Sequence, residues 1–398
     1  MHIGMVAYTF YESDNRVMRY AETLAARGDQ VDVIALRRPG DNSAECEING
    51  VRLYRVQSRL HDEKGVGSYA GKIGKFLLRA SWLLSALHGR HRYDVVHVHS
   101  VPDFLVFAAW LPKLTGAKVI LDIHDLLPEL YISKFNRSVG GATHRGLILV
   151  EHACAAVSNH VIVANHLWRD KLIARGAVAP EKCTAILNFP DETIFKRNGY
   201  APDPKKFTIM YPGTLNWHQG LDIALEAFGV VRPSAPQVQF HIYGDGSSKP
   251  SLVNLSRALG LQDAVVFHEP VPLRHMANTM ATADLAVVPK RRDSFGDEAF
   301  STKTLEFMIL GVPLIVADTT IDKHYFDDSV VKFFRSGDVA SLATCMLELI
   351  NNPALRHRLA DNGFRFAQQY TWQAHSQDYL QIVDSLGGKR PSRLASAA

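Results

Sequence analysis

The chain has 398 residues, enough for two sizeable domains, and its 47% hydrophobic and 21% charged content excludes an intrinsically disordered protein. A formal net charge of +4 is too small to indicate nucleic-acid binding, although it suits an anionic ligand or an anionic membrane surface. The cysteines stand far apart with no metal-binding spacing, which favours a reducing cytoplasm: Cys46, Cys154, Cys183 and Cys345.

The first half of the chain alternates short hydrophobic strands with helices. We expect a strand over 3–7, a helix over 16–27 and a second strand over 31–36. This βαβ unit predicts a parallel sheet. The first turn has no glycine, which disfavours a nicotinamide enzyme, and Asp14 in that turn is more simply a helix cap than a ligand contact. We expect no signal peptide and no membrane-spanning helix.

Residues 72–87 are expected to form a basic amphipathic helix. Its apolar face includes Phe76 and Trp82. Such a helix covers a sheet more often than it lies on an anionic membrane, and both roles can hold for different residues. The cations beside the two aromatic side chains are Lys72, Lys75 and Arg79.

Histidines stand near the ends of two further strands. His97 and His99 alternate along one strand and so lie on the same side, while the strand over 118–123 ends at His124. Ligands collect beyond the carboxyl ends of strands in doubly wound sheets. A His-x-His pair could bind zinc, but no third ligand is evident nearby, so we predict no metal site. Packing explains His97 at least as well as catalysis does.

The second half repeats the alternation of strands and helices. Residues 196–206 are rich in proline, glycine and charge, as in a linker, and 207–211 begin a new sheet. A loop over 212–220 precedes a helix over 221–228, and the alternation across 207–349 predicts a second doubly wound domain.

The most informative stretch is a helix expected over 302–310. Ser301 is a suitable N-cap, and Gly311 stands where a left-handed glycine ends a helix. The start of a helix suits an anionic phosphate, and Glu298 and Glu306 can accept hydrogen bonds from sugar hydroxyls on either side of it. A solvated pair between Lys303 and Glu306 is the alternative interpretation.

The Glu298-x7-Glu306 spacing resembles the motif of the retaining GT-B glycosyltransferases of family 4, the glycosyl transferases group 1. Ser301-x-Lys303-x-x-Glu306 resembles a bacterial polysaccharide-type branch. The resemblance implies an α/β fold of the GT-B class, with two doubly wound Rossmann-like domains facing each other across a cleft. It implies an N-terminal acceptor-side domain over 1–190, a nucleotide-sugar-binding domain over 207–370 and a helix over 373–386 that returns to the first domain. The basic composition of 387–398 indicates a disordered tail.

The same resemblance implies the roles of individual residues. Glu298 contacts the donor sugar, Glu306 contacts the ribose, and His124 lies beside the sugar, so His124 and Glu298 are the catalytic candidates. The donor-binding candidates are Gly213, Thr214, Gln219, Lys290, Arg291, Ser301, Lys303 and Glu306. The family's glycine loop has an arginine and a lysine where this chain has Thr214 and Gln219. The cationic clamp must therefore come from elsewhere, and Lys303 and the run at 290–292 are close by, although a solvated loop would also explain that run.

The implied activity is transfer of a sugar from a nucleotide-sugar donor to a glycan or lipid-linked acceptor, in cell-envelope or exopolysaccharide synthesis. We expect no cofactor and no metal requirement, because the chain has no Asp-x-Asp triplet. A cytoplasmic location is expected, with peripheral contact at the inner face of the plasma membrane. A GT-B-type nucleotide-sugar epimerase and a non-catalytic sugar-nucleotide-binding subunit are the alternatives.

Overall fold

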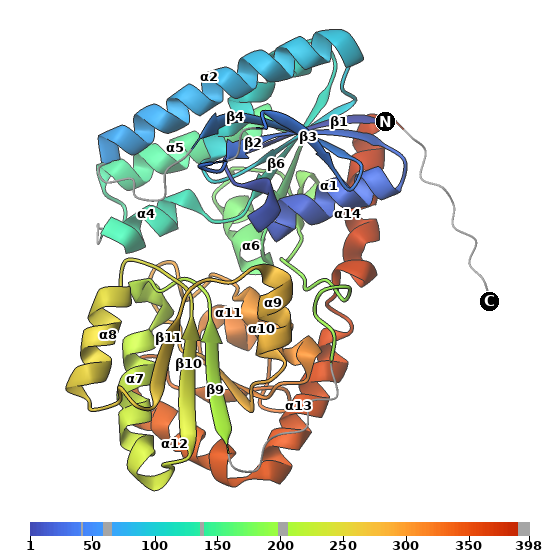
Figure 1. Ribbon diagram of the computed structural model, residues 1–398. Helices are drawn as coiled ribbons and strands as arrows, with labels where there is room; N and C mark the ends of the chain where they lie inside the picture. The colour runs from blue at the N-terminus through green and yellow to red at the C-terminus, as the bar shows by residue number, and fades with distance from the viewer. Residues whose placement is uncertain (41–42, 59–65, 136–138, 198–205, 389–398) are drawn as a thin grey trace. The chain divides into compact units, whose positions relative to one another are not determined.

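The computed structural model describes residues 1–40, 43–58, 66–135, 139–197 and 206–388 (Figure 1). The chain forms two compact units. Unit 1 comprises Met1–Asn188 and His375–Ala398, and unit 2 comprises Phe189–Ala374. Residues 198–205 of the predicted linker and 389–398 of the predicted tail lie outside the described residues.

Unit 1 is built on an eight-stranded sheet. Its strands are β1 His2–Ala7, β2 Gln30–Arg37, β3 Glu45–Ile48, β4 Val51–Ser58, β5 Val95–His99, β6 Lys118–Ile123, β7 His160–Val163 and β8 Cys183–Ala185. Their order is β3-β4-β2-β1-β5-β6-β7-β8, and all neighbours are parallel except β3 and β4. The central strands are runs of buried Val and Ile, as expected for a sheet covered by helices on both faces.

Seven α-helices and three short 3₁₀ helices of the described residues surround this sheet. They are α1 Asn15–Ala26, α2 Val66–His91, α3 Trp110–Leu114, α4 Leu127–Phe135, α5 Ala142–Val157, α6 His166–Ala174 and α14 Trp372–Gly387, with η1 Tyr11–Ser13, η2 Asp103–Ala109 and η3 Pro180–Lys182. Helices α1 and α14 contact the face that carries His97 and Asp122. Helix α2 covers the other face, where the ring of Phe76 packs edge-on against Tyr8 with centroids 5.0 Å apart.

Helices α1 and α2 of unit 1 behave as their sequence patterns indicate. Helix α1 begins with Asp14 as its N-cap, since Asp14 Oδ1 accepts a hydrogen bond from the Val17 N–H at 3.2 Å. The capping interpretation of Asp14 is therefore confirmed. Helix α2 is longer than predicted at both ends. Its Phe76 is fully buried while its Trp82 is 73% exposed, so one face of α2 packs on the sheet and another is left open.

Unit 2 is built on a six-stranded, entirely parallel sheet. Its strands are β9 Phe207–Pro212, β10 Val238–Tyr243, β11 Val265–His268, β12 Leu285–Val288, β13 Leu314–Ala317 and β14 Lys332–Phe334. Their order is β11-β10-β9-β12-β13-β14, and Figure 1 shows β9, β10 and β11 side by side. This sheet is the second doubly wound sheet that the sequence predicts.

The helices of unit 2 include the one expected over 302–310. They are η4 Trp217–Gln219, α7 Leu221–Val231, η5 Arg232–Ser234, α8 Lys249–Ala258, α9 Leu273–Met280, α10 Thr302–Leu310, α11 Thr320–Tyr325, α12 Val339–Asn351 and α13 Pro353–Ala367. Side chains of α7 and α12 pack with β9 and β10 in one hydrophobic core, which includes Phe228, Met346, Ile209 and Phe240. Across the described ranges, no helix is both long and apolar enough to cross a membrane.

Gly220 and Gly260 provide a matched test of backbone strain in unit 2. Both have φ near +68°, but a Cβ on Gly220 would lie 2.0 Å from the Pro289 carbonyl oxygen, whereas a Cβ on Gly260 would meet nothing within 4 Å. Gly260→Ala should lower the free energy of unfolding by about 1–2 kcal/mol, the cost of a left-handed residue. Gly220→Ala should cost about 1–3 kcal/mol more, because the clash adds to it. Urea unfolding of both variants measures the difference, and equal losses would contradict the close contact with Pro289.

Candidate functional site

Backbone contact between two glycine loops shapes the carboxyl edge of the unit 2 sheet. Gly213 follows β9 and Gly244 follows β10, with φ of 138° and 142°. A Cβ on Gly244 would lie only 1.9 Å from the Gly213 carbonyl oxygen, so glycine is required there. The Gly213 N–H donates to the Tyr243 carbonyl at 2.9 Å, which holds the first loop against the second.

Tyr211 organises the loop that contains Thr214 and Gln219. Its hydroxyl lies 3.0 Å from Gln219 Oε1 and 3.1 Å from the Thr214 carbonyl oxygen. Tyr211 is fully buried, and burial raises the pKa of its hydroxyl well above the ordinary value, so the hydroxyl remains a donor. The Gln219 side chain is therefore turned toward the protein, while Thr214 is exposed.

Lys303, in the first turn of α10, places its ammonium beside the same loop. Its Nζ lies 3.1 Å from the position that a Cβ on Gly213 would take and 5.3 Å from the centroid of the Tyr211 ring. No described residue forms a hydrogen bond or ion pair with this ammonium, and Glu306 acts on it only through its charge. Burial lowers the pKa of Lys303 to about 8. The site thus holds a partly desolvated cation, which suits an anionic ligand.

Helix α10 begins and ends where the sequence predicts. Ser301 has an extended backbone at the N-cap and Gly311 is left-handed at the C-cap, with φ of 73°. The Ser301 hydroxyl, however, makes no capping bond: it is buried and has no partner in the described structure. The Thr304 hydroxyl, one turn away, is also buried without a described partner. The start of α10 is therefore left without its side-chain cap.

The loop that carries Glu298 is anchored on both sides. Asp297 accepts hydrogen bonds from the Thr320 N–H at 2.8 Å and the Thr320 hydroxyl at 2.7 Å. Lys290 donates to the Ala299 carbonyl at 2.7 Å and pairs with Asp322 at 2.9 Å. These contacts fix the backbone on either side of Glu298 just ahead of α10.

The side chains of Lys290 and Arg291 are both engaged by other protein groups and stabilise the loops around the site. A solvated loop is the wrong interpretation for Lys290, which is 3% exposed and bonded to Asp322. Arg291 pairs with Asp222 and donates to the Trp217 carbonyl at 3.2 Å, with its guanidinium over the Trp217 ring. The structure brings Gly213, Thr214, Gln219 and Lys303 together, but it directs Lys290 and Arg291 into the loops around them.

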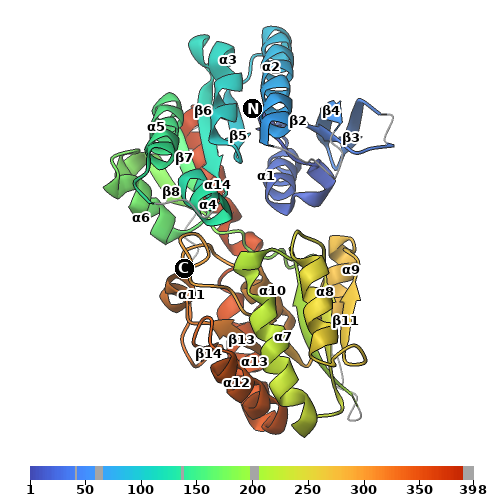
Figure 2. The same cartoon turned by 90° about the vertical axis from the view of Figure 1, so that its left-hand side faces the viewer.

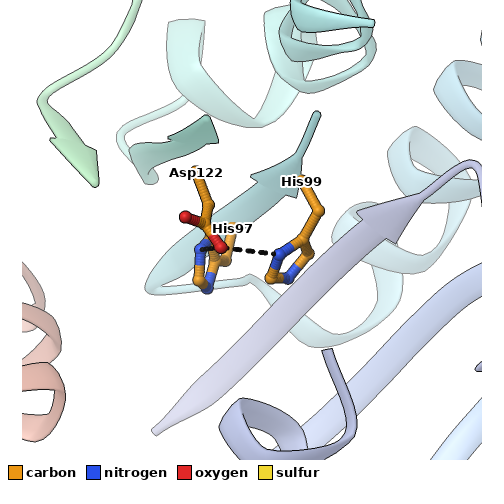
Figure 3. A group of neighbouring side chains, drawn as sticks. All are labelled: His97, His99 and Asp122. Atoms are coloured by element: carbon orange, nitrogen blue, oxygen red, sulfur yellow. Dashed lines mark hydrogen bonds and ion pairs between the residues drawn. The ribbon is translucent and has the colours of Figure 1, made fainter. Parts of the chain in front are cut away.

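In unit 1, the alternation of side chains along two strands brings three polar residues to one face, and a fourth follows just after the second strand. His97 and His99 lie on β5, and Asp122 on β6 is the register partner of His99. His124 stands just beyond the end of β6, and its Nε2 lies 3.0 Å from Asp122 Oδ2. Figure 3 shows both imidazole rings on the same side of β5, beside the Asp122 carboxylate.

Asp122 is the centre of this cluster. Its two oxygens accept from Arg16 Nη2 at 2.7 Å and Nε at 2.8 Å, and Oδ2 also lies 3.0 Å from His124 Nε2 and 3.2 Å from His99 Nδ1. Burial by itself would raise the pKa of Asp122, but Arg16 and His124 outweigh it and hold that pKa well below the ordinary value. Burial lowers the pKa of His97 and of His99, so both rings are neutral near pH 7. Asp122 is thus an ionised acceptor for several donors.

The prediction that the His-x-His pair lacks a third ligand is wrong. His97, His99 and Asp122 offer ligand atoms within 4.8 Å of one another. Charge still disfavours a metal ion, because Arg16 already neutralises Asp122, and a divalent cation would add positive charge beside a buried guanidinium. His97 instead bonds the Tyr379 hydroxyl at 3.0 Å, which ties α14 to the sheet and confirms its packing role.

Sequence reasoning missed three residues of this cluster. Asp122 could have been found, because it stands two places before His124, near the end of the strand that His124 follows. Arg16 could not be assigned to Asp122, 106 residues away, from local pattern. Asp103, at the start of η2, is 2% exposed, and burial raises its pKa to about 6 while His124 lowers it. The neighbourhood of His124 therefore contains a second buried carboxyl group.

Two family models together match most of the chain. The "Glycosyl transferase 4-like domain" matches residues 13–188, and "Glycosyl transferases group 1" matches residues 192–366. A phosphatidyl-myo-inositol mannosyltransferase of Mycobacterium leprae is 22% identical over 97% of both chains. A D-inositol 3-phosphate glycosyltransferase of Thermobispora bispora is 24% identical over 92% of this chain and 88% of its own.

Solved structures show the same fold. The sucrose-phosphate synthase of Thermosynechococcus elongatus has a TM-score of 0.80 at 17% identity, covering 98% of this chain and all of that chain. The Anabaena protein HepE, in complex with UDP and glucose, has a TM-score of 0.72 at 15% identity, covering 97% of this chain and all of that chain. The two parallel α/β units thus have the GT-B fold. The chain belongs to the GT-B glycosyltransferases, and it is an enzyme of that class.

Lys290 provides a test of the difference between support and ligand contact. Lys290→Met would leave Asp322, which is fully buried, without its cation, and should lower the free energy of unfolding by about 3–5 kcal/mol. Lys323→Met is the control, since the Lys323 side chain is 57% exposed and should cost less than about 0.5 kcal/mol. Chemical unfolding of both variants measures the losses, and equal small losses would show that Lys290 supports nothing.

Proposed function

We propose that this glycosyltransferase uses a nucleotide-sugar donor held by unit 2 and transfers the sugar with retention of its anomeric configuration. The observation that carries the proposal is the ammonium of Lys303, which lies beside Gly213 at the start of α10 and has no hydrogen-bond or ion-pair partner among the described residues. A desolvated cation and the free N–H groups of a helix start are both complementary to a diphosphate. Lys303 would thereby replace the cationic clamp that Thr214 and Gln219 cannot supply.

Within this proposal Ser301, Glu306 and Glu298 contact different parts of the donor. The Ser301 hydroxyl, which has no described partner, would donate to a phosphate oxygen. Glu306 would accept from the ribose hydroxyls, and Glu298 from the hydroxyls of the sugar. Lys290 and Arg291 would act indirectly, since they hold the loops that carry Glu298 and Gln219.

The proposed reaction needs no cofactor and no metal ion. The bond between the sugar and the diphosphate breaks, a bond to the acceptor hydroxyl forms on the same face, and the acceptor's proton passes to the leaving phosphate. Charge grows on that phosphate as its bond breaks, so electrostatic stabilisation by Lys303 and the start of α10 would be the main catalytic contribution. We propose a glycan or lipid-linked acceptor in cell-envelope or polysaccharide synthesis, in keeping with the phosphatidyl-myo-inositol mannosyltransferase among the relatives.

A transfer assay with chelator present tests the whole proposal. Nucleotide sugars that raise the melting temperature would be incubated with an acceptor extract, with and without EDTA, and the product linkage read by NMR. Transfer with an unchanged anomeric configuration, insensitive to EDTA, is expected. Conversion of the donor without any acceptor would indicate an epimerase, and neither reaction would indicate a binding subunit. Loss of activity in EDTA that metal restores would refute metal independence.

The two glutamates should fail in different ways. Ribose contacts are much the same before and during the reaction, so Glu306→Ala should mainly weaken donor binding. Charge develops at the sugar, so Glu298→Gln should mainly lower kcat. Each loss should be about 2–3 kcal/mol if the lost bond is charge-assisted. Affinity for the nucleoside diphosphate, which lacks the sugar, should fall only in Glu306→Ala. If both variants kept the wild-type affinity and turnover, Glu298 and Glu306 would not contact the donor.

Lys303 should make donor binding depend on pH. Its pKa of about 8 means that the ammonium form, which attracts the diphosphate, is lost as the pH rises through that value. Affinity for UDP or GDP, measured by calorimetry, should therefore fall above pH 8. Lys303→Arg should flatten this dependence because a guanidinium stays charged, and Lys303→Met should weaken binding at pH 7 by about 1.5–3 kcal/mol. An unchanged affinity in Lys303→Met would remove this residue from the site.

We further propose peripheral contact with an anionic membrane through unit 1. The apolar–basic surface consists of Leu78, Trp82, Trp110 and Leu114 with Lys75 and Arg79, and its four apolar side chains are 51–77% exposed. Helices α2 and α3 stand side by side in Figure 2, and Trp110 Nε1 donates to Ser81 Oγ at 3.0 Å, which joins them. Val66–His91 contains no acidic residue, so nothing on α2 would oppose an anionic lipid.

Vesicle sedimentation checks this surface. The protein should bind anionic vesicles at low salt and leave them at high salt, and Lys75→Glu should weaken binding by about 1 kcal/mol or more. Trp82→Ala with Leu114→Ala should reduce binding that persists at high salt. Leu149→Ala is the control, because Leu149 is 71% exposed on α5, a helix that contributes no residue to the defined surface. Equal effects of the control and the double variant would refute the surface.

A further inference from the structure

His124 is bound to the protein through one of its two ring nitrogens. Nε2 lies 3.0 Å from Asp122 Oδ2, whereas no described residue forms a hydrogen bond with Nδ1. The side chain of His124 is 20% exposed and that of Asp122 is fully buried. The ring therefore stands between a buried carboxylate and the solvent, with a different nitrogen toward each.

The state of Asp122 decides which nitrogen of His124 carries the proton. Arg16 holds the carboxylate bidentately and donates from Nη1 to the Ile186 carbonyl at 2.8 Å, so neither charge can move away. An ionised carboxylate only accepts hydrogen bonds, so the nitrogen facing it must carry hydrogen. In a neutral His124, Nε2 is then the donor and Nδ1 is left as an acceptor.

The other groups around His124 are consistent with this assignment. The His99 ring is 5.5 Å away in an edge-on arrangement, and its own Nδ1 faces the same carboxylate at 3.2 Å. Arg16, Asp103 and Asp125 act on the cluster through their charges. None of these three forms a hydrogen bond with Nδ1 of His124.

We propose that Asp122, clamped by Arg16, is a positioning residue that fixes His124 in its Nε2–H form, so that Nδ1 accepts a hydrogen bond from a sugar hydroxyl. The proposal rests on the proposed glycosyltransferase function and on the family resemblance, which implies that His124 lies beside the sugar. It assigns a chemical selectivity: the group opposite His124 must be a hydrogen-bond donor. A sugar with hydrogen or fluorine in place of that hydroxyl loses the contact, because neither can donate.

Nuclear magnetic resonance tests the tautomer without any reaction. Histidine labelled with ¹³C and ¹⁵N in the full chain reports which ring nitrogen of His124 carries hydrogen, with His124→Gln giving the assignment. The wild type should show the Nε2–H form. Asp122→Asn should lose it, because an amide presents an N–H group to one of its partners.

Tyr379→Phe is the matched control: it removes a hydrogen bond of the same buried network, at His97, and should leave His124 unchanged. An Nδ1–H form in the wild type would overturn the proposal.

Kinetics tests the consequence for transfer. His124→Ala and Asp122→Asn should each lower kcat at least tenfold, which corresponds to about 1.4 kcal/mol. The double variant should lose no more than either alone, since both remove one contact. Because Asp122→Asn leaves Arg16 unpaired, Arg16→Gln with Asp122→Asn serves as the second, charge-neutral variant, and circular dichroism confirms its folding.

The outcomes separate this inference from the proposed function. Full activity of His124→Ala would refute the sugar contact, while the resonance experiment still decides whether Asp122 fixes the ring. Reduced activity in His124→Ala, with unchanged kcat and tautomer in a folded Asp122 variant, would overturn the positioning role itself. With substrates that lack the critical hydroxyl, wild type and Asp122→Asn should react equally slowly.

Discussion

The buried carboxylate of Asp122 is the constraint on which the carboxyl edge of the unit 1 sheet depends. A buried charge is costly unless a charge of opposite sign lies beside it, and Arg16 in the first turn of α1 provides that charge. Nη1 of Arg16 also donates a hydrogen bond to the carbonyl of Ile186, just after β8. The same carboxylate orders His99 and His124, and His97 extends the network to Tyr379 on α14. The Arg16–Asp122 ion pair and its hydrogen bonds thus link β5, β6, α1 and the end of β8. These elements must keep their relative positions for all of these contacts to form.

The strand ends of the two units are held in place by different physical means. Unit 1 uses a network of buried charges and rings, in which position depends on hydrogen-bond partners. Unit 2 uses backbone contact, because Gly213 and Gly244 approach too closely for any side chain, and it then places one ammonium beside them. The hydrogen-bond network of unit 1 determines which atoms donate and which accept. The ammonium in unit 2 creates a position that is electrostatically favourable for negative charge.

Local features were predictable from the sequence because they depend on neighbours in the chain. Ser301 and Gly311 mark the ends of α10, Asp14 caps α1, and the runs of Val and Ile mark the strands. The partners of charged side chains were not predictable. Lys290 and Lys303 look alike in the sequence, yet one is paired with Asp322 and the other has no described partner. That difference depends on residues brought together by the fold, as does the pairing of Arg16 with Asp122.

The path of the chain affects the order in which the protein can be completed during synthesis. Unit 2 is one continuous segment, Phe189–Ala374, whereas unit 1 includes the part of α14 from His375 to Gly387, which the ribosome adds after unit 2. Until Tyr379 on α14 has been made, the ring of His97 on β5 and the ring of Tyr20 on α1 lack the side chain that packs against both. Unit 1 is therefore begun first and completed last, and in the nascent chain His97 and Tyr20 lack their contact with Tyr379 throughout the synthesis of unit 2.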